Sequence, residues 1–191
     1  MFSQAAIFLI TTIGGLFTLA LLLRFMLQWL RAPARNPLSE FVAALTNFAV
    51  LPARRVIPGL WGLDLATLML AWLAEAAQLW LVLQFKGYEV GPAVGVALVA
   101  LATLAAIELA RIAIYVVMTA IVLQAILSWV NPHSPLAPLL TTVTRPLLRP
   151  IQKRVPPIAN VDLSPLFVLI VCQLLLTVPL AWLDARAYHW L

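Results

Sequence analysis

One polar segment occurs twice in this sequence, and each copy stands between two long apolar runs. The first copy covers 36–68 and the second covers 131–166. The opening Asn-Pro pair and the serine after it recur 95 positions later. The second copy then has three extra residues, and later matches are 98 positions apart, as for Asp64 and Asp162. A repeat of this kind predicts a chain built from two copies of one supersecondary unit.

The apolar runs around the repeated segment indicate the class of protein. Several are about 20 residues long, the length that crosses the hydrocarbon core of a bilayer as a helix. Hydrophobic residues make up 64% of the chain and charged residues 10%, whereas soluble domains contain about 25% charged residues. We therefore predict an all-α membrane protein with about four transmembrane helices. The first run reaches Leu30 with no basic stretch before it, so we expect a span there and no cleaved signal peptide.

The two copies predict two parallel repeats, each a helical hairpin with an amphipathic interfacial segment between its spans. The first repeat, 1–90, is expected to hold spans at about 4–30 and 65–83 and the interfacial segment 36–62. The second repeat, 91–191, is expected to hold the long apolar segment 92–130, the interfacial segment 131–161 and the span 163–183. An even number of crossings in each copy gives both copies the same orientation in the membrane.

The long apolar segment 92–130 is the hardest to fit to a bilayer. As one straight helix it would measure about 58 Å, nearly twice the hydrocarbon thickness. Two crossings would each be short and would leave the second basic segment outside, against the positive-inside rule. We therefore expect one crossing, from about Arg111 to Val130. Residues 93–107 would then form a separate apolar helix that lies in the outer interface, re-enters the membrane or packs on another protomer.

The repeated segment has the pattern of an interfacial helix. In the first copy, six apolar residues at helical spacing form one face: Leu38, Phe41, Val42, Leu45, Phe48 and Ala49. The second copy has a similar stripe that prolines at 146 and 150 interrupt: Leu136, Leu139, Leu140, Val143 and Leu147. A helix with one apolar face and basic residues at its end, next to a span, is expected to lie in the interface plane.

Basic residues are concentrated in and beside the two copies. Eight of the twelve lysines and arginines lie there: Arg31, Arg35, Arg54, Arg55, Arg145, Arg149, Lys153 and Arg154. By the positive-inside rule both copies face the cytoplasm, which puts both termini on the outer side. Topology alone explains these charges. Beyond topology, such clusters attract anionic lipid at about 1 kcal/mol per charge, or present a surface to a protein partner. They lack interleaved aromatic residues, so we expect no nucleic-acid binding.

Polar and charged side chains within the predicted apolar segments are candidates for function. We single out seven of them: Arg24, Gln28, Glu75, Glu108, Arg111, Gln124 and Gln173. Arg24 and Glu75 are expected at similar depth, where a salt bridge between adjacent spans would avoid an unpaired charge. Glu108 and Arg111 are three residues apart and can pair on one helix face near the outer boundary.

The repeat offsets also predict a polar centre between the copies. An offset of 98 aligns Glu75 with Gln173, and an offset of 96 aligns Gln28 with Gln124. These four side chains are therefore expected to lie together. One interpretation is a polar network that holds helices together, and we favour it. The other is a path for an ion or a proton, with Glu75 at its centre.

Asp64 and Asp162 each stand just before a predicted span. A carboxylate there can accept hydrogen bonds from the free N–H groups of the first helical turn and lies at the positive end of the helix dipole. We therefore predict that both are helix caps. The alternative is an ion pair with the basic residues that end each copy, which are Arg54 and Arg55, or Lys153 and Arg154.

The sequence offers little for catalysis or metal binding. Cys172 is the one cysteine and lies in an apolar run, so no intramolecular disulfide can form. His133 and His189 are far apart and have no cysteine or carboxylate at ligand spacing. No nucleophile–base pair, phosphate loop or paired-carboxylate motif is present. We predict no enzymatic activity, no catalytic residues, no metal and no cofactor.

Together, these motifs resemble the YggT family, also called YlmG, of bacterial and plastid membrane proteins. The resemblance is carried by NPLSEFVAALTN, RRVIPG and GLDLATL in the first copy, and by ILSWVNPHSP, TRPLLRPI and DLSPL in the second. It covers 24–80 and 119–180. The first copy departs from the family pattern at Phe48 and Leu51, where the second has Pro146 and Arg149.

The resemblance implies a small multi-pass protein of the bacterial inner membrane without known enzymatic activity. Family members are associated with osmotic or ion tolerance, with cell division and envelope organisation, and in plastids with cytochrome b6 maturation and nucleoid distribution. We therefore predict a non-enzymatic envelope factor whose basic amphipathic segments bind anionic lipid or recruit a partner, either another protein or a second copy of the chain. The alternative is a small ion channel or transporter with a polar path around Glu75.

Overall fold

The computed structural model describes residues 2–33, 36–59, 62–87, 94–131, 133–154 and 162–189. This part of the chain contains helices and no strand: α1 (Phe2–Trp29), α2 (Pro37–Val56), α3 (Leu65–Phe85), α4 (Val94–Val130), α5 (Ala137–Gln152), α6 (Ser164–Leu175), the π-helical turn η1 (Leu176–Leu180) and α7 (Ala181–Tyr188). Four helices within it are long and apolar enough to cross a membrane: Phe2–Trp29, Leu65–Phe85, Gly95–Val130 and Ser164–Tyr188. The predicted all-α membrane class is therefore confirmed.

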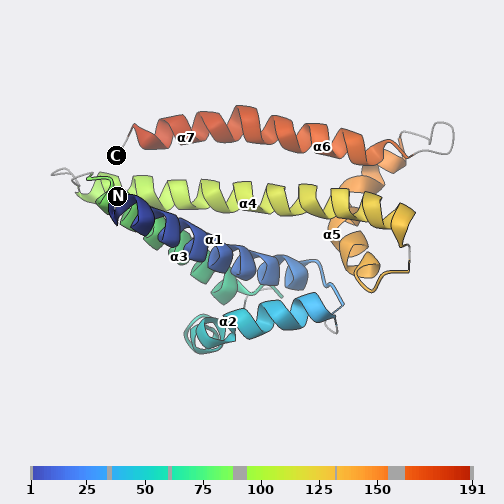
Figure 1. Ribbon diagram of the computed structural model, residues 1–191, viewed down its shortest axis with the longest axis horizontal. Coiled ribbons are helices and arrows are strands. Elements are labelled where there is room, and N and C mark those ends of the chain that lie inside the picture. Colours follow the sequence, from blue (N-terminus) through green and yellow to red (C-terminus); the bar gives the residue numbers. More distant parts are fainter. Residues whose placement is uncertain are drawn as a thin grey trace.

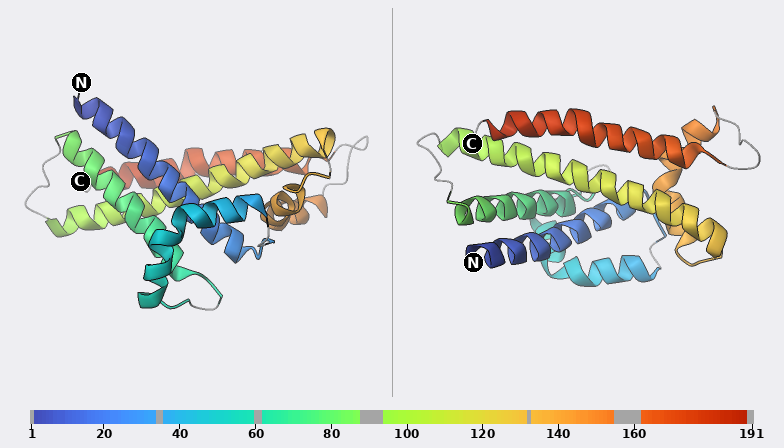
Figure 2. Two further views of the ribbon diagram at one scale, coloured as in Figure 1. Left: turned by 60° about the horizontal axis from the view of Figure 1, so that its bottom comes forward. Right: turned by 45° about the horizontal axis from the view of Figure 1, so that its top comes forward.

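The helices form two groups that meet at α4. Figure 1 shows α1 packed with α3, and α4 running beside the continuous rod of α6, η1 and α7. The start of α1 and the end of α7 lie at the same end of the molecule, and α5 lies across the opposite end of α4 (Figure 1). Figure 2 shows that α1 and α3 cross α4 obliquely. The two groups are therefore tilted relative to each other.

The expected break in the long apolar segment is absent, because α4 is one helix of 37 residues. The predicted separate helix over 93–107 is wrong. No proline or polar run interrupts 94–107, and a helix of about 55 Å can still fit a bilayer if it is tilted. The early part of α4 also packs within the molecule, since the Trp72 side chain of α3 donates a hydrogen bond to the Ala102 carbonyl at 3.0 Å.

Helices α1 and α3 pack closely in an antiparallel arrangement. A Cβ atom added at Gly14 would meet Oε1 of Gln78, so the end of that side chain lies against the glycine and would have to move. Further along, Leu21 of α1 and Ala71 of α3 are fully buried in one hydrophobic cluster. Because residue numbers fall along α1 as they rise along α3, the last turns of α1 lie level with the first turn of α3.

Helix α2 folds back along α1, with two different faces. Val42, Thr46 and Val50 are spaced four apart and are buried against the neighbouring helices. Phe41 and Phe48 are 61% and 72% exposed, although the Phe48 ring stacks on the ring of Phe17 of α1. The single predicted apolar face is thus divided into a packed row and an outward row. Figure 2 shows that α2 bends in its last third, where Pro52 removes a backbone N–H donor.

Helix α5 repeats the packing of α2 against its own neighbours. Leu139, Leu140 and Val143 of the predicted stripe are buried, and the helix continues to Gln152 across Pro146 and Pro150. At the matching positions, the hydroxyls of Thr46 and Thr144 are fully buried and donate to the carbonyl four residues earlier, at 2.7 and 2.9 Å. The two copies of the segment therefore share a packing solution as well as a sequence pattern.

The α1–α3 contact predicts different effects at two adjacent glycines. Gly14→Ala forces the end of the Gln78 side chain to move, which should offset the gain of about 0.5–1 kcal/mol expected when a helical glycine becomes alanine. Gly15→Ala meets nothing within 4 Å and should stabilise α1 by about 0.5–1 kcal/mol. Thermal unfolding in detergent measures both changes, and Gln78→Ala should restore stability to Gly14→Ala. Equal stability of the two single variants would contradict the proposed close contact.

Candidate functional site

Asp64 joins the end of α2 to the start of α3. It is the N-cap of α3, where its carboxylate accepts from the Thr67 backbone N–H at 3.3 Å and from the Thr67 hydroxyl. Arg54 donates to the same carboxylate from Nε at 3.2 Å and from Nη2 at 2.5 Å, and also to Gln28 at 3.1 Å. Burial raises the pKa of Asp64, but the hydrogen bonds from Arg54 and Thr67 outweigh it, so this pKa lies below its usual value. Asp64 therefore has both predicted roles, cap and ion-pair partner.

Asp162 holds the matching joint through a neutral partner, but Leu163 is the N-cap of α6 and no side chain caps that helix, so the predicted capping role of Asp162 is wrong. It accepts from the Ser164 backbone N–H and from Nε2 of Gln152, both at 2.8 Å. Gln152 is 98 positions after Arg54, as Asp162 is after Asp64. The predicted alternative pairing with Lys153 or Arg154 is therefore wrong, because the residue before them on α5 holds the carboxylate. Burial raises the pKa of Asp162, and these hydrogen bonds outweigh it and lower the pKa.

Arg24 does not pair with Glu75, contrary to expectation. The ion pairs among the described residues are Arg54–Asp64, Arg111–Glu108 and Arg111–Asp184. Arg24 instead donates to the Thr46 hydroxyl at 2.7 Å and to the Asn47 side chain at 2.9 Å. The reason is that α1 extends to the level of the first turn of α3, where α2 lies alongside it. Arg24 is thus near the end of the α1–α3 pair, whereas Glu75 is about 16 Å beyond Asp64 along α3.

Glu75 lies in a small polar group between α1 and α3. Its side chain is 3% exposed and accepts from Nε2 of Gln78 at 3.3 Å. Thr18 of α1 lies beside it. Within the described part of the chain, neither Oε2 of Glu75 nor the Thr18 hydroxyl has a partner with hydrogen-bond geometry. A buried carboxyl oxygen without a partner is unusual and marks this group as a second candidate site.

The predicted polar centre of four side chains does not form. Gln28 binds Arg54 at the end of α1, and Gln124 hydrogen-bonds with Thr144 of α5. Gln173 is exposed on α6 and Glu75 is buried between α1 and α3. Equivalent positions in two parallel repeats come together only if they face a shared axis. Here Gln28, Glu75 and Gln124 contact residues of their own repeat, and Gln173 is exposed.

The predicted pair on α4 is present and has a third member. Glu108 accepts from Arg111 at 2.6 Å, three residues along the helix, so this prediction is confirmed. Arg111 also binds Asp184 of α7. Sequence reasoning missed Asp184, because a contact across 73 residues leaves no local spacing. A carboxylate at the end of the last apolar run was the available signal.

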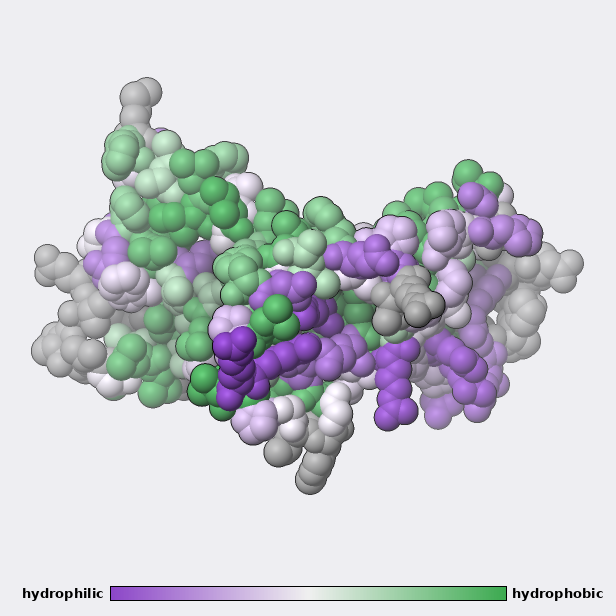
Figure 3. Space-filling view, turned by 90° about the horizontal axis from the view of Figure 1, so that it is seen from below, coloured by the Kyte–Doolittle hydropathy of each residue, from purple (hydrophilic) through white to green (hydrophobic). Residues whose placement is uncertain are grey.

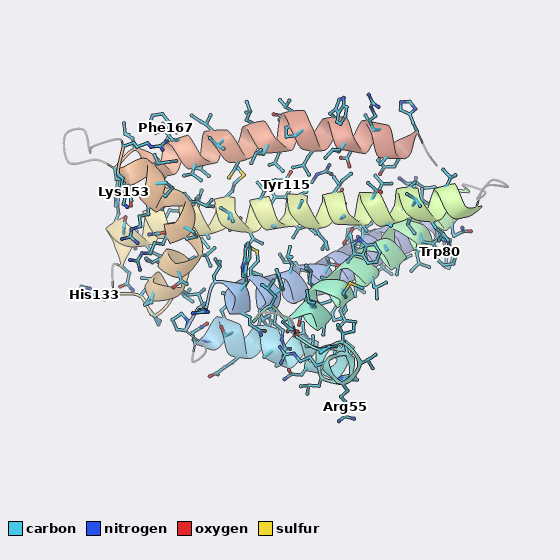
Figure 4. All side chains as sticks on the ribbon, turned by 180° about the vertical axis from the view of Figure 1, so that it is seen from behind. Arg55, Trp80, Tyr115, His133, Lys153 and Phe167 are labelled. Carbon is cyan, nitrogen blue, oxygen red and sulfur yellow. The ribbon has the colours of Figure 1, made fainter. Side chains whose placement is uncertain are left out.

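The remaining basic residues do not form one continuous patch. Figure 4 shows Arg55 at the end of α2, far from Lys153 at the end of α5. Viewed from below, hydrophilic side chains gather in the middle and toward the α5 end (Figure 3). A groove of about 870 Å³ between the end of α1 and α5 is lined by five of the eight: Arg31, Arg145, Arg149, Lys153 and Arg154. Arg35 lies outside the described residues.

Arg31 reaches this groove from a backbone conformation that favours glycine. It is the described non-glycine residue with a positive φ, 53°, and follows the last turn of α1. The next N–H, of Ala32, bonds the Leu27 carbonyl at 2.8 Å and so ends the helix. An L-residue in this left-handed region costs roughly 1–2 kcal/mol. Arg31 therefore occupies a backbone position at which a glycine would be more stable.

These arrangements support binding of anions more readily than covalent chemistry. In the described residues, no group of three or more His, Cys, Asp or Glu side chains is placed to hold a metal ion. Cys172 is buried. The groove, by contrast, presents five cations with the Trp29 ring at its edge.

Comparisons with known proteins place both halves of the chain in one family. The family model described as CCB3/YggT matches residues 3–85 and 103–183. An uncharacterised protein of Pseudomonas aeruginosa is 38% identical over 175 residues, which are 91% of this chain and 87% of that protein. The protein YggT of Escherichia coli K12, also described as uncharacterised, is 31% identical over 85% of this chain and 82% of its own length. No solved structure matches the chain.

The charge on Asp64 predicts a pH-dependent contribution to stability. Asp64→Asn keeps a capping side chain but removes the charge that Arg54 faces, and should lower the free energy of unfolding by about 1–3 kcal/mol at neutral pH. Because the pKa of Asp64 is lowered in the folded state, its stabilisation is present above the unfolded-state pKa and is lost as pH falls through the folded-state pKa. The difference between wild type and variant should therefore disappear on acidification.

Thermal unfolding in detergent over a pH series measures this difference. Asp162→Asn is the matched control, and it should cost less because its partners are Gln152 and a backbone N–H. A difference for Asp64→Asn that persists at acid pH would show that the effect is not electrostatic.

Proposed function

The chain belongs to the CCB3/YggT family, and from that premise we propose a non-enzymatic role in which α2 and α5 bind anionic phospholipid at the cytoplasmic face of the bacterial inner membrane. In this proposal the four apolar helices are the spans, and both chain ends lie on the outer side. Family members are associated with osmotic tolerance, cell division and membrane-protein maturation. In this proposal these associations follow because the protein organises lipid or a partner at this face.

The observation that carries the proposal is the outward row of α2. Phe41, Leu45, Phe48 and Leu51 are all exposed, while the opposite side of the helix is packed on α1. An apolar row on one side of a helix that ends in Arg54 and Arg55 suits the boundary between acyl chains and headgroups. Helix α2 lies beside the last turns of α1, at the end of the span, and this position also supports placing it at that boundary.

The basic residues supply the preference for negative lipid. Arg54 is held by Asp64, but the remaining described cations of the two segments have no carboxylate partner among the described residues. Charges next to a bilayer attract anionic lipid by about 1 kcal/mol each. The same charges also satisfy the positive-inside rule, so lipid binding and orientation have a common cause.

The test measures lipid enrichment around the full-length protein. In bilayers of phosphatidylcholine with a minor fraction of phosphatidylglycerol, spin-labelled lipids should show a preference of the protein for phosphatidylglycerol. Arg145→Gln with Arg149→Gln should reduce this preference by about fivefold for each charge, and added salt should reduce it for wild type. Lys86→Gln with Arg186→Gln, at the other end of the molecule, is the matched control. Equal loss in both double variants, or no preference in wild type, would refute the proposal.

A second candidate function rests on Glu75. Its buried carboxyl with one unpartnered oxygen is a feature of ion and proton sites in membranes. The separation of Gln28, Gln124 and Gln173 from it favours a local structural role instead. We therefore expect potassium and sodium flux into proteoliposomes to be the same for wild type and Glu75→Gln. Flux that wild type supports and the variant loses would favour the channel or transporter.

A further inference from the structure

The two copies of the repeated segment have diverged in charge. In the first copy, Arg54 is occupied by Asp64 and Gln28. In the second, Gln152 takes the equivalent place and holds Asp162. The cations of α5 are thereby left unpaired within the described residues. The first copy therefore has an arginine neutralised by a carboxylate, whereas the cations of α5 are available to bind a ligand.

The free cations of α5 form a row. Arg145, Arg149 and Lys153 are four residues apart, so they lie along one side of the helix over about 12 Å. Arg31 and Arg154 complete the lining of the groove. No acidic residue lines it among the described residues, and the neighbouring stretches 34–35 and 155–161 contain none in the sequence. The groove is therefore built for more than one negative group.

The position of the groove indicates a lipid as the source of those groups. Trp29, the last residue of α1, is 59% exposed and lines the groove together with Leu30. A tryptophan at the end of an apolar helix is typical of the headgroup level of a membrane. Basic pockets between spans at the cytoplasmic side suit lipid phosphates. This row of three cations, together with Arg31 and Arg154 in the same lining, can pair two phosphates.

We propose that the groove between α1 and α5 binds one phospholipid whose headgroup carries two phosphate groups, with Arg31 as a contact to it. This inference rests on the proposed function and makes it specific, since it names the lipid class and confines the site to the groove between the end of α1 and α5. Arg31 occupies a backbone position at which glycine is favoured. A charge at the mouth of the groove explains why an arginine stands there.

The experiment uses the full-length protein in a zwitterionic detergent. Three probes are titrated: diphosphatidylglycerol with two phosphates, phosphatidylglycerol with one, and inorganic pyrophosphate as a soluble source. Native mass spectrometry gives the affinities, and thermal unfolding gives the ligand-induced stabilisation. We expect diphosphatidylglycerol to bind at least about fivefold more tightly than phosphatidylglycerol, as one added charge pair would give. Pyrophosphate should neither bind comparably nor displace the lipid.

Arg31→Gly separates binding from folding. It removes a groove charge and relieves the left-handed backbone, so affinity for diphosphatidylglycerol should fall about fivefold while the unfolding temperature stays the same or rises. Arg31→Lys keeps the charge and should retain most of the affinity. Arg149→Gln should weaken binding to a similar extent, and Arg55→Gln, outside the groove, is the matched control.

Each outcome decides a different point. Equal affinity for the two lipids would overturn the two-phosphate site and leave the proposed function standing. Absence of binding by either lipid would overturn both. Displacement of lipid by pyrophosphate would overturn the lipid as the source. Losses in Arg55→Gln as large as in Arg149→Gln, or unchanged affinity in Arg31→Gly, would overturn the assignment to this groove.

Discussion

The structure depends on the way each carboxylate holds α2 or α5 to the long apolar helix that follows it. The first N–H groups of a helix have no partner within the helix and must be satisfied by a side chain or by water. Asp64 and Asp162 accept such N–H groups and, with their remaining oxygen, a side chain from the end of α2 or α5. Helix α2 is thereby fixed to α3, and α5 to α6.

The two joints differ in charge, although the two repeats share one packing arrangement. Arg54 makes the first joint an ion pair, and Gln152 makes the second a neutral hydrogen bond. The core packing behind the joints is alike, with Thr46 and Thr144 buried and bonded to their own helices. Only the first joint pairs a cation with its carboxylate. The basic residues of α5 therefore stay unpaired among the described residues, although both copies keep the same fold. Three cations of the groove beside α5, Arg145, Arg149 and Arg154, stand where the first copy has Asn47, Leu51 and Val56.

The tilt between the two hairpins explains most departures from expectation. Oblique crossing lets α4 extend over 37 residues without leaving the molecule, and its early turns meet Trp72. The same tilt keeps the glutamines of the two copies apart, so Glu75 has local neighbours only. Asp184 meets Arg111 because α7 runs beside α4. Comparing the length of each helix with the thickness of a bilayer could not predict these contacts, because helix tilt is set by packing.

The helical class, the four long apolar helices, the capping role of Asp64 and the Glu108–Arg111 pair could all be predicted from residue patterns. They follow from apolar length, helical spacing and position next to a span, which are local properties of the chain. The packing of the helices was needed to show that Arg24 binds Thr46, that Gln152 replaces a cation at Asp162, and that five basic residues line one groove. Those outcomes depend on the rotation and tilt of whole helices, which many weak contacts fix together and no single motif encodes.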